Sequence, residues 1–234
     1  MLVLAIDSSE KTASAALVCD GKLAAQTTVT NREKDHSSNL LPTVESLMKA
    51  AGKEYGDIDC FAVSAGPGSF TGIRIGISTV KGLAFGRGKI CVGVSTLEAL
   101  AYNFTDTDGI ICPVMDARRG NLYNAVFRSS GGTITRLTED RLISASDLAA
   151  ELNKFSETVY FCGGGYELAA AACRGTVVFA ETGQLRRWQS GLGVALAAEE
   201  KIKLGETTDD VSLAPVYLRP SSAERLKNGK SSEH

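Results

Sequence analysis

The chain has 234 residues, a net charge of −2 and an apolar share of 44%, which is typical of a soluble protein with one large or two small domains. This charge balance argues against a protein that grips nucleic acid through a broad basic surface. The apolar start ends at Asp7 without a preceding basic region and predicts a buried strand, and no apolar run is long enough to span a membrane. The six cysteines occur without a C-x-x-C pair, which predicts reduced thiols in a cytoplasmic protein.

The first half of the chain predicts three strands followed by alternating helices and strands. The strands cover residues 2–6, 13–19 and 23–30, with a hairpin at Asp20-Gly21. Apolar residues at helical spacing predict a helix over 40–48 that stops by Gly52. A strand at 60–64, a glycine-rich loop, a helix over 73–85, a strand at 90–94 and a helix after Ser95 follow. The resulting order is βββαβαβα.

The stretch A-G-P-G-S-F-T-G-I-R-I-G, residues 65–76, contains four glycines between a predicted strand and a predicted helix. Glycine turns at helix N-termini expose N–H groups that suit anions, but they also let a helix pack closely on a strand. The spacing matches neither a P-loop nor a complete dinucleotide fingerprint. Three residues of the stretch are therefore candidates for a degenerate phosphate-type loop: Gly66, Gly68 and Ser69.

The second half of the chain begins as the first half does. Residues 114–132 parallel residues 5–21, since both contain a strand that ends in aspartate, a polar turn, a second strand and a glycine hairpin. A strand at 133–137, a helix through 148–152, a strand at 159–162 and a glycine turn at 163–165 follow. Asp7 thus corresponds to Asp116. We predict an N-terminal lobe at 1–104, a duplicated C-terminal lobe at 105–218 and a disordered polar tail at 219–234.

Two α/β lobes that face each other across a cleft describe the actin-like ATPase fold class, which includes sugar kinases and Hsp70. In that class the two Asp-ended hairpins flank nucleotide phosphates and a metal, so Asp7, Ser8 and Asp116 are candidate site residues. Alternatively, the two aspartates only cap turns by accepting backbone N–H bonds. The sequence leaves both interpretations open.

Five motifs, in order along nearly the whole chain, resemble the bacterial TsaB (YeaZ) family. They are I-D-S-S (6–9), H-S-S-N-L-L-P (36–42), G-P-G-S-F-T-G-I-R-I-G-I-S-T-V-K-G-L-A (66–84), M-D-A-R-R (115–119) and P-V-Y-L-R-P (215–220). The resemblance implies a noncatalytic subunit for making N6-threonylcarbamoyladenosine on tRNAs that read A-starting codons. It implies as partners the catalytic paralogue TsaD and the ATPase TsaE, and indirect contact with tRNA, whereas the homodimer expected when the chain is alone follows from an apolar patch on the helices of the first lobe. ATP or ADP would act only in the complex.

The segment V-S-T-L-E-A-L, residues 94–100, bears on catalysis. TsaD-like proteins carry V-N-H-x-x-x-H at this place, and the two histidines hold a metal. Here Thr96 and Leu100 stand at those positions, and neither side chain replaces imidazole at a transition-metal site. Ser95 and Glu98 instead have capping-box spacing. We therefore predict no metal, no intrinsic cofactor and no catalytic residue, since His36 also lacks a partner constellation in the sequence.

Each of two basic clusters has two possible interpretations, and two alternative functions of the chain also remain open. Arg118 and Arg119 suit either a phosphate or acidic partner, or solvated surface charge. The run 186–188, Arg-Arg-Trp, suits either stacking on RNA or a helix start with a buried tryptophan. The alternative functions are an active kinase or metallohydrolase of the same fold class, and a standalone RNA-binding module.

Two helices of the first lobe form the predicted partner surface. The apolar residues of the helix over 73–85 spread over more than one stripe at 100° per residue, so they cannot all face one sheet. An exposed apolar patch usually marks a binding site. We therefore predict that TsaD binds through these residues: Leu41, Val44, Met48, Ile73, Gly76, Ile77, Val80 and Leu83.

Overall fold

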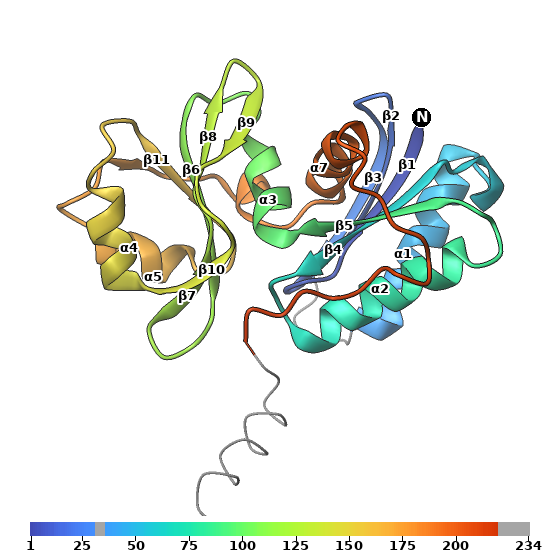
Figure 1. The fold of residues 1–234 in the computed structure, drawn as a ribbon, viewed down its shortest axis with the longest axis horizontal. Coiled ribbons are helices and arrows are strands. Elements are labelled where there is room, and N and C mark those ends of the chain that lie inside the picture. Colours follow the sequence, from blue (N-terminus) through green and yellow to red (C-terminus); the bar gives the residue numbers. More distant parts are fainter. Residues whose placement is uncertain (31–35, 220–234) are drawn as a thin grey trace, which may run out of the picture.

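The computed structural model describes residues 1–30 and 36–219, and for residues 36–38 it describes the backbone only. The chain forms two α/β lobes that lie side by side, each built around one sheet (Figure 1). The predicted tail lies, apart from Arg219, outside the described residues. The side chain of His36 also lies outside them.

The first sheet has the strand order β3-β2-β1-β4-β5. Its members are β1 (Leu2–Asp7), β2 (Thr12–Cys19), β3 (Lys22–Thr30), β4 (Cys60–Gly66) and β5 (Ile90–Ser95). The first three strands form an antiparallel meander, and β4 and β5 continue the sheet parallel to β1. Strands β1 and β4 are almost continuously apolar because both faces of the sheet are covered.

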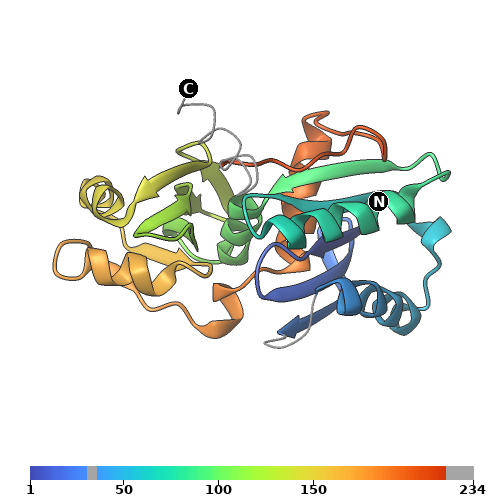
Figure 2. The ribbon, with the colours of Figure 1, turned by 90° about the horizontal axis from the view of Figure 1, so that it is seen from below.

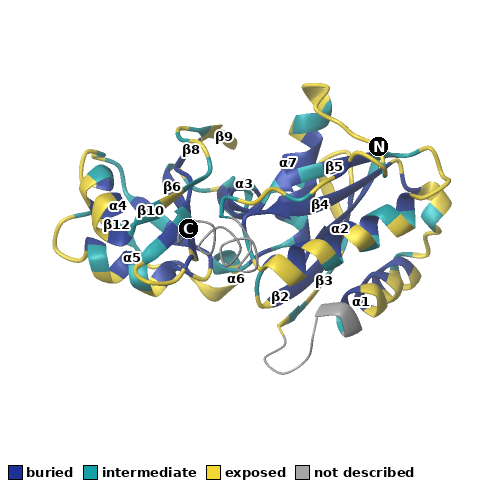
Figure 3. Ribbon diagram, turned by 60° about the horizontal axis from the view of Figure 1, so that its bottom comes forward, coloured by how far each residue is buried: buried dark blue, intermediate teal, exposed yellow. Residues whose placement is uncertain are grey.

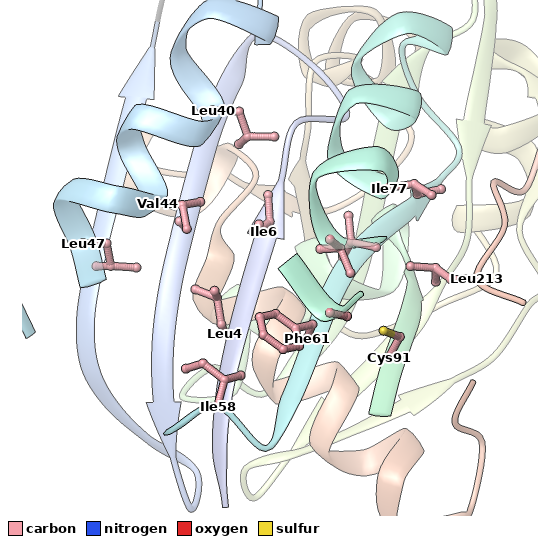
Figure 4. Packing of buried hydrophobic residues seen from close by; sticks show 14 of the residues in the cluster. Leu4, Ile6, Leu40, Val44, Leu47, Ile58, Phe61, Ile77, Cys91 and Leu213 are labelled. Atoms are coloured by element: carbon pink, nitrogen blue, oxygen red, sulfur yellow. The ribbon is translucent and has the colours of Figure 1, made fainter. Parts of the chain in front are cut away.

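Helices α1 (His36–Ala51) and α2 (Phe70–Ala84) cover one face of this sheet (Figure 2), and a short turn, η1 (Tyr55–Asp57), leads into β4. Leucine and valine side chains of α1 point onto the sheet, and Ile77 of α2 lies over the β4 side of the sheet (Figure 4). Apolar residues of both helices pack with those of the sheet and form the largest core cluster of the lobe.

The second sheet repeats the topology of the first. It contains seven strands, and the main path β10-β7-β6-β11-β12 matches β3-β2-β1-β4-β5 when β6 is equated with β1. The hairpin β8-β9 extends it along β6. This repeat confirms the predicted duplication and the two-lobed actin-like fold class. The strands are β6 (Gly109–Asp116), β7 (Asn121–Asn124), β8 (Phe127–Ser130), β9 (Thr133–Arg136), β10 (Arg141–Ser144), β11 (Val159–Cys162) and β12 (Phe179–Ala180).

Short helices complete the second lobe and the junction between the lobes. Helices α4 (Ala145–Leu152) and α5 (Tyr166–Cys173) pack together on the second sheet, in a core cluster centred on Phe161. The small helix α6 (Gln184–Arg187) follows them. Helix α3 (Thr96–Ala101) and the turn η2 (Tyr102–Phe104) connect the two sheets, and their apolar side chains share a core cluster with β6.

The last helix, α7 (Gly191–Lys203), packs on the first sheet and not on the second. Its Val194 and Ala198 bury against the face that α1 and α2 leave uncovered. Residues 204–219, which we call the strap, then cross the first lobe, where Leu213 enters the core and Val216 N–H donates to Ala65 O at 2.8 Å. The predicted second lobe at 105–218 is therefore too long at its C-terminal end. The chain returns to the first lobe there, because an apolar face of the first sheet would otherwise stay uncovered.

The six cysteines are free thiols, and five of them are buried. Burial raises the pKa of the Cys60 thiol to about 12, so this thiol stays protonated and unreactive near neutral pH. The predicted location of cysteines in the core is confirmed for those five. Among residues 1–30 and 36–219, no helix has the length and apolarity required to cross a bilayer.

Candidate functional site

The two aspartates that end equivalent strands make equivalent turns. Asp7 Oδ1 accepts a hydrogen bond from Ser9 N–H at 2.8 Å, and Asp116 Oδ1 accepts one from Arg118 N–H at 2.7 Å. Asp7 is fully buried and also accepts from the hydroxyls of Ser9 and Ser64. Asp116 is exposed and lies 3.6 Å from the Arg118 guanidinium. Both aspartates therefore cap their turns.

The glycine loop at residues 66–72 packs directly against the hairpin turn at residues 8–10. A Cβ on Gly68 would lie 2.5 Å from Ser9 O, and a Cβ on Gly72 would lie 2.1 Å from Ser8 O. Ser69 N–H donates to Ser9 O at 2.7 Å, and the Ser69 hydroxyl accepts from Gly72 N–H as the cap of α2. The strap packs equally closely on Gly66, since a Cβ on Gly66 would lie 2.2 Å from Val216 O. The glycines thus serve close backbone contacts within the chain.

The glycine turn at residues 163–165 also directs its N–H groups at acceptors of this chain. Gly163 N–H donates to Arg187 O at 2.6 Å, and Gly165 N–H donates to Val114 O at 2.9 Å. Gly164 N–H donates to the Glu10 carboxylate at 3.0 Å. Glu10 lies in the hairpin that follows Asp7, between the first two strands, but no motif of the sequence marks it as a site residue.

The positions that correspond to metal-binding histidines lie in the core. Thr96 and Leu100 are both fully buried, and no metal-binding side chains gather around them in groups of three or more within the described ranges. Ser95 caps α3 by accepting from Glu98 N–H at 3.2 Å, which confirms the predicted cap. The Glu98 carboxylate does not close a capping box but pairs with Arg136 at 3.2 Å.

We expect the purified chain to hold no stoichiometric zinc or iron. A tight transition-metal site requires several imidazole or thiolate ligands at defined geometry, and Thr96 and Leu100 provide none. Elemental analysis of the protein, purified without chelator, should give well below one equivalent of either metal. One equivalent that survives dialysis would contradict this expectation.

The two basic clusters have different surroundings. Arg118 and Arg119 are exposed and both adopt positive φ values, 68° and 56°, in the turn that follows Asp116. Arg186 pairs with Asp106 at 2.6 Å, whereas Arg187 stacks 3.7 Å over the Tyr166 ring. Trp188 is half-buried and follows α6, so it does not begin a helix. The guanidinium groups at 186 and 187 are thereby used in contacts within the chain.

Most of the predicted partner residues are internal. Val44, Ile73 and Val80 have exposed fractions of 1% or less, and Gly76, Ile77 and Met48 are also buried. Leu83 is partly buried and packs against the core, which leaves only Leu41, at 42% exposure, on the surface. The assignment of the six buried residues to an exposed patch is wrong, because α2 packs against α1, the sheet and the strap and so buries more than one stripe.

The outer faces of α1 and α2 are solvent-exposed (Figure 3). Ser78 and Gly82 lie on the outer side of α2, and a Cβ built on Gly82 meets nothing within 4 Å. Phe85, which ends α2, is 76% exposed. Small residues on an exposed helix face leave room for close approach of a second helix.

Comparison with known proteins gives consistent similarities. A profile of the family described as "TsaD: tRNA N6-adenosine threonylcarbamoyltransferase" matches residues 24–224. The chain is 32% identical to the tRNA threonylcarbamoyladenosine biosynthesis protein TsaB of Bacillus subtilis over 96% of both chains. It is 30% identical to the Escherichia coli protein of the same description, over 98% of this chain and 100% of the relative. The solved structure of YeaZ from Pseudomonas aeruginosa has the same fold, with a TM-score of 0.80 at 24% identity over 93% of this chain and 99% of that one.

Proposed function

The chain belongs to the TsaB family of tRNA threonylcarbamoyladenosine biosynthesis proteins, and we propose that it works there as a noncatalytic subunit. In this role it binds the catalytic paralogue TsaD and the ATPase TsaE, and it reaches tRNA only through the complex. The modified base is N6-threonylcarbamoyladenosine in tRNAs that read A-starting codons. The chain itself holds no metal or nucleotide, ATP or ADP acts only in the assembled complex, and assembly takes place in the cytoplasm.

The observation that carries this proposal is the contact of the hairpin turn at residues 8–10 with both glycine turns. In an actin-like ATPase, turns at these places surround the phosphates. Here Ser9 O accepts a hydrogen bond from Ser69 N–H in the first lobe, and the Glu10 carboxylate accepts one from Gly164 N–H in the second. Because these donors are engaged and the turn atoms lie in contact, the arrangement supports a scaffold more than a nucleotide-hydrolysing site.

We further propose that TsaD docks on the exposed faces of α1 and α2, through Leu41, Ser78 and Gly82 and the neighbouring Phe85. These residues are exposed, unlike most of those that the sequence predicts for this surface. A pairing of matching helices between two proteins of one fold buries both apolar edges in a small bundle. The same face forms a homodimer when the partner is absent.

The function is tested by reconstitution with purified TsaD, TsaE, ATP, the threonylcarbamoyl donor and unmodified tRNA. The complete mixture should form threonylcarbamoyladenosine, and omission of this chain should reduce the product to background. This chain with tRNA, donor and ATP, but without TsaD, should form none. Product in that last mixture would establish the alternative of an active enzyme, and full activity without this chain would rule out an essential subunit.

A further inference from the structure

Glu10 joins the two lobes through a single carboxylate oxygen. Its Oε2 accepts a hydrogen bond from Gly164 N–H at 3.0 Å and another from Gln189 Nε2 at 2.5 Å. Gly164 belongs to the glycine turn of the second lobe, whereas Gln189 belongs to the segment that leads from α6 back to the first lobe. One oxygen of the hairpin turn at residues 8–10 therefore fastens both the second lobe and the connection between the lobes.

The partners of Glu10 are held in place for this contact. Gln189 is only 2% exposed, and its Oε1 accepts a hydrogen bond from Thr12 Oγ1 at 3.4 Å, so the amide nitrogen is directed at Glu10. A Cβ on Gly164 would lie 2.5 Å from Glu10 Oε1, so the approach of the carboxylate requires a glycine there. Both hydrogen bonds end on Oε2, which means that a proton on Oε1 leaves them intact.

The surroundings of Glu10 disfavour its negative charge. Burial raises the pKa of Glu10 to about 7, against the opposing effect of the hydrogen bonds from Gln189 and Gly164. Among the charged groups that face it, Asp7 on β1 raises the pKa further and Lys11 lowers it. From the second lobe, the Cys162 thiol faces it with a pKa that burial holds well above its usual range, so this group stays neutral.

We propose that Glu10 is a proton-sensitive latch that holds the hairpin turn of the first lobe against the glycine turn of the second lobe. When the contact opens, the carboxyl group returns to water and its pKa returns to about 4.5, so the closed contact binds a proton more tightly than the open one. Protonation of Glu10 thus stabilises the closed contact fully below about pH 4.5, and this stabilisation is lost as the pH rises through about 7. Ionisation loosens the latch, and protonation fastens it.

The test is hydrogen exchange of the Gly164 amide, followed by NMR on the full-length chain at pH 6 and pH 8. After correction for the intrinsic exchange rate, the protection of Gly164 in the wild type should fall about tenfold between these pH values, since opening releases about one proton at pH 6 but almost none at pH 8. Glu10→Gln imitates the protonated carboxyl and should keep its protection at both pH values. Glu10→Ala removes the acceptor and should lose protection at both.

Glu139→Gln is the matched control, because it removes one negative charge from an exposed position of the second lobe. It should retain the pH dependence of the wild type. The proposal is overturned if the protection of Gly164 in the wild type is the same at both pH values, or if Glu10→Gln shows the same fall as the wild type. Should Glu10→Ala fail to fold, the comparison of Glu10→Gln with Glu139→Gln still decides between these outcomes.

Discussion

Replacing Gly72 with alanine is expected to lower the free energy of unfolding by about 3 kcal/mol. The added methyl group would lie 2.1 Å from Ser8 O and 3.2 Å from Ser8 C, which are backbone atoms at the end of β1. Ser8 cannot move away freely, because its hydroxyl donates to Gly72 O at 2.9 Å and the residue is buried. Either the hairpin turn or the start of α2 must shift. Urea denaturation followed by circular dichroism measures the change.

Gly82→Ala is the matched control for this prediction, since it makes the same chemical change in the same helix. Gly82 is exposed and a Cβ there meets nothing within 4 Å, so alanine should stabilise the helix by about 1 kcal/mol. The two variants are therefore expected to have effects of opposite sign. A loss of stability at Gly72 no larger than the effect at Gly82 would mean that the hairpin turn and the glycine loop are not in close contact.

A charge at Gly82 is expected to abolish binding of TsaD while the chain stays folded. Gly82→Glu places a carboxylate on the outer face of α2, where the proposed partner helix approaches closely. Burying an unpaired charge in an interface costs about 2–4 kcal/mol, which weakens binding by about 30- to 1000-fold. Calorimetric titration of TsaD into the variant measures the affinity, and the reconstituted modification assay should show a parallel loss.

The control for the binding experiment is again Gly82→Ala, which removes the glycine without adding charge. It should retain most of the affinity, and both variants should melt at or above the temperature of the wild type. Val80→Glu would be an unsuitable probe, because Val80 is fully buried and the charge would unfold the lobe. Undiminished binding by Gly82→Glu would move the TsaD interface away from the outer face of α2.

The sequence alone determined the elements that depend on local pattern. Alternation and apolar runs placed β1, β2 and β4, and the repeated Asp-ended hairpin revealed the duplication that the two strand orders confirm. The cap of α3 at Ser95 was also predictable, because a cap involves residues only three positions apart. The family could be recognised because its motifs are contiguous runs of letters. Each of these features depends on neighbours along the chain.

Only the tertiary structure decided which surface covers each apolar face. The periodicity of α2 shows that its apolar residues are spread widely, but it does not show that Ile73 and Val80 share one core with residues of α1, the sheet and the strap. Likewise, the apolar stripe of α7 fits either sheet, and only the uncovered face of the first sheet assigns it there. Glu10 meets Gly164 from 154 positions away, and no local pattern encodes such a contact. Burial and polar contacts between distant segments arise from packing, which the sequence specifies only through the whole fold.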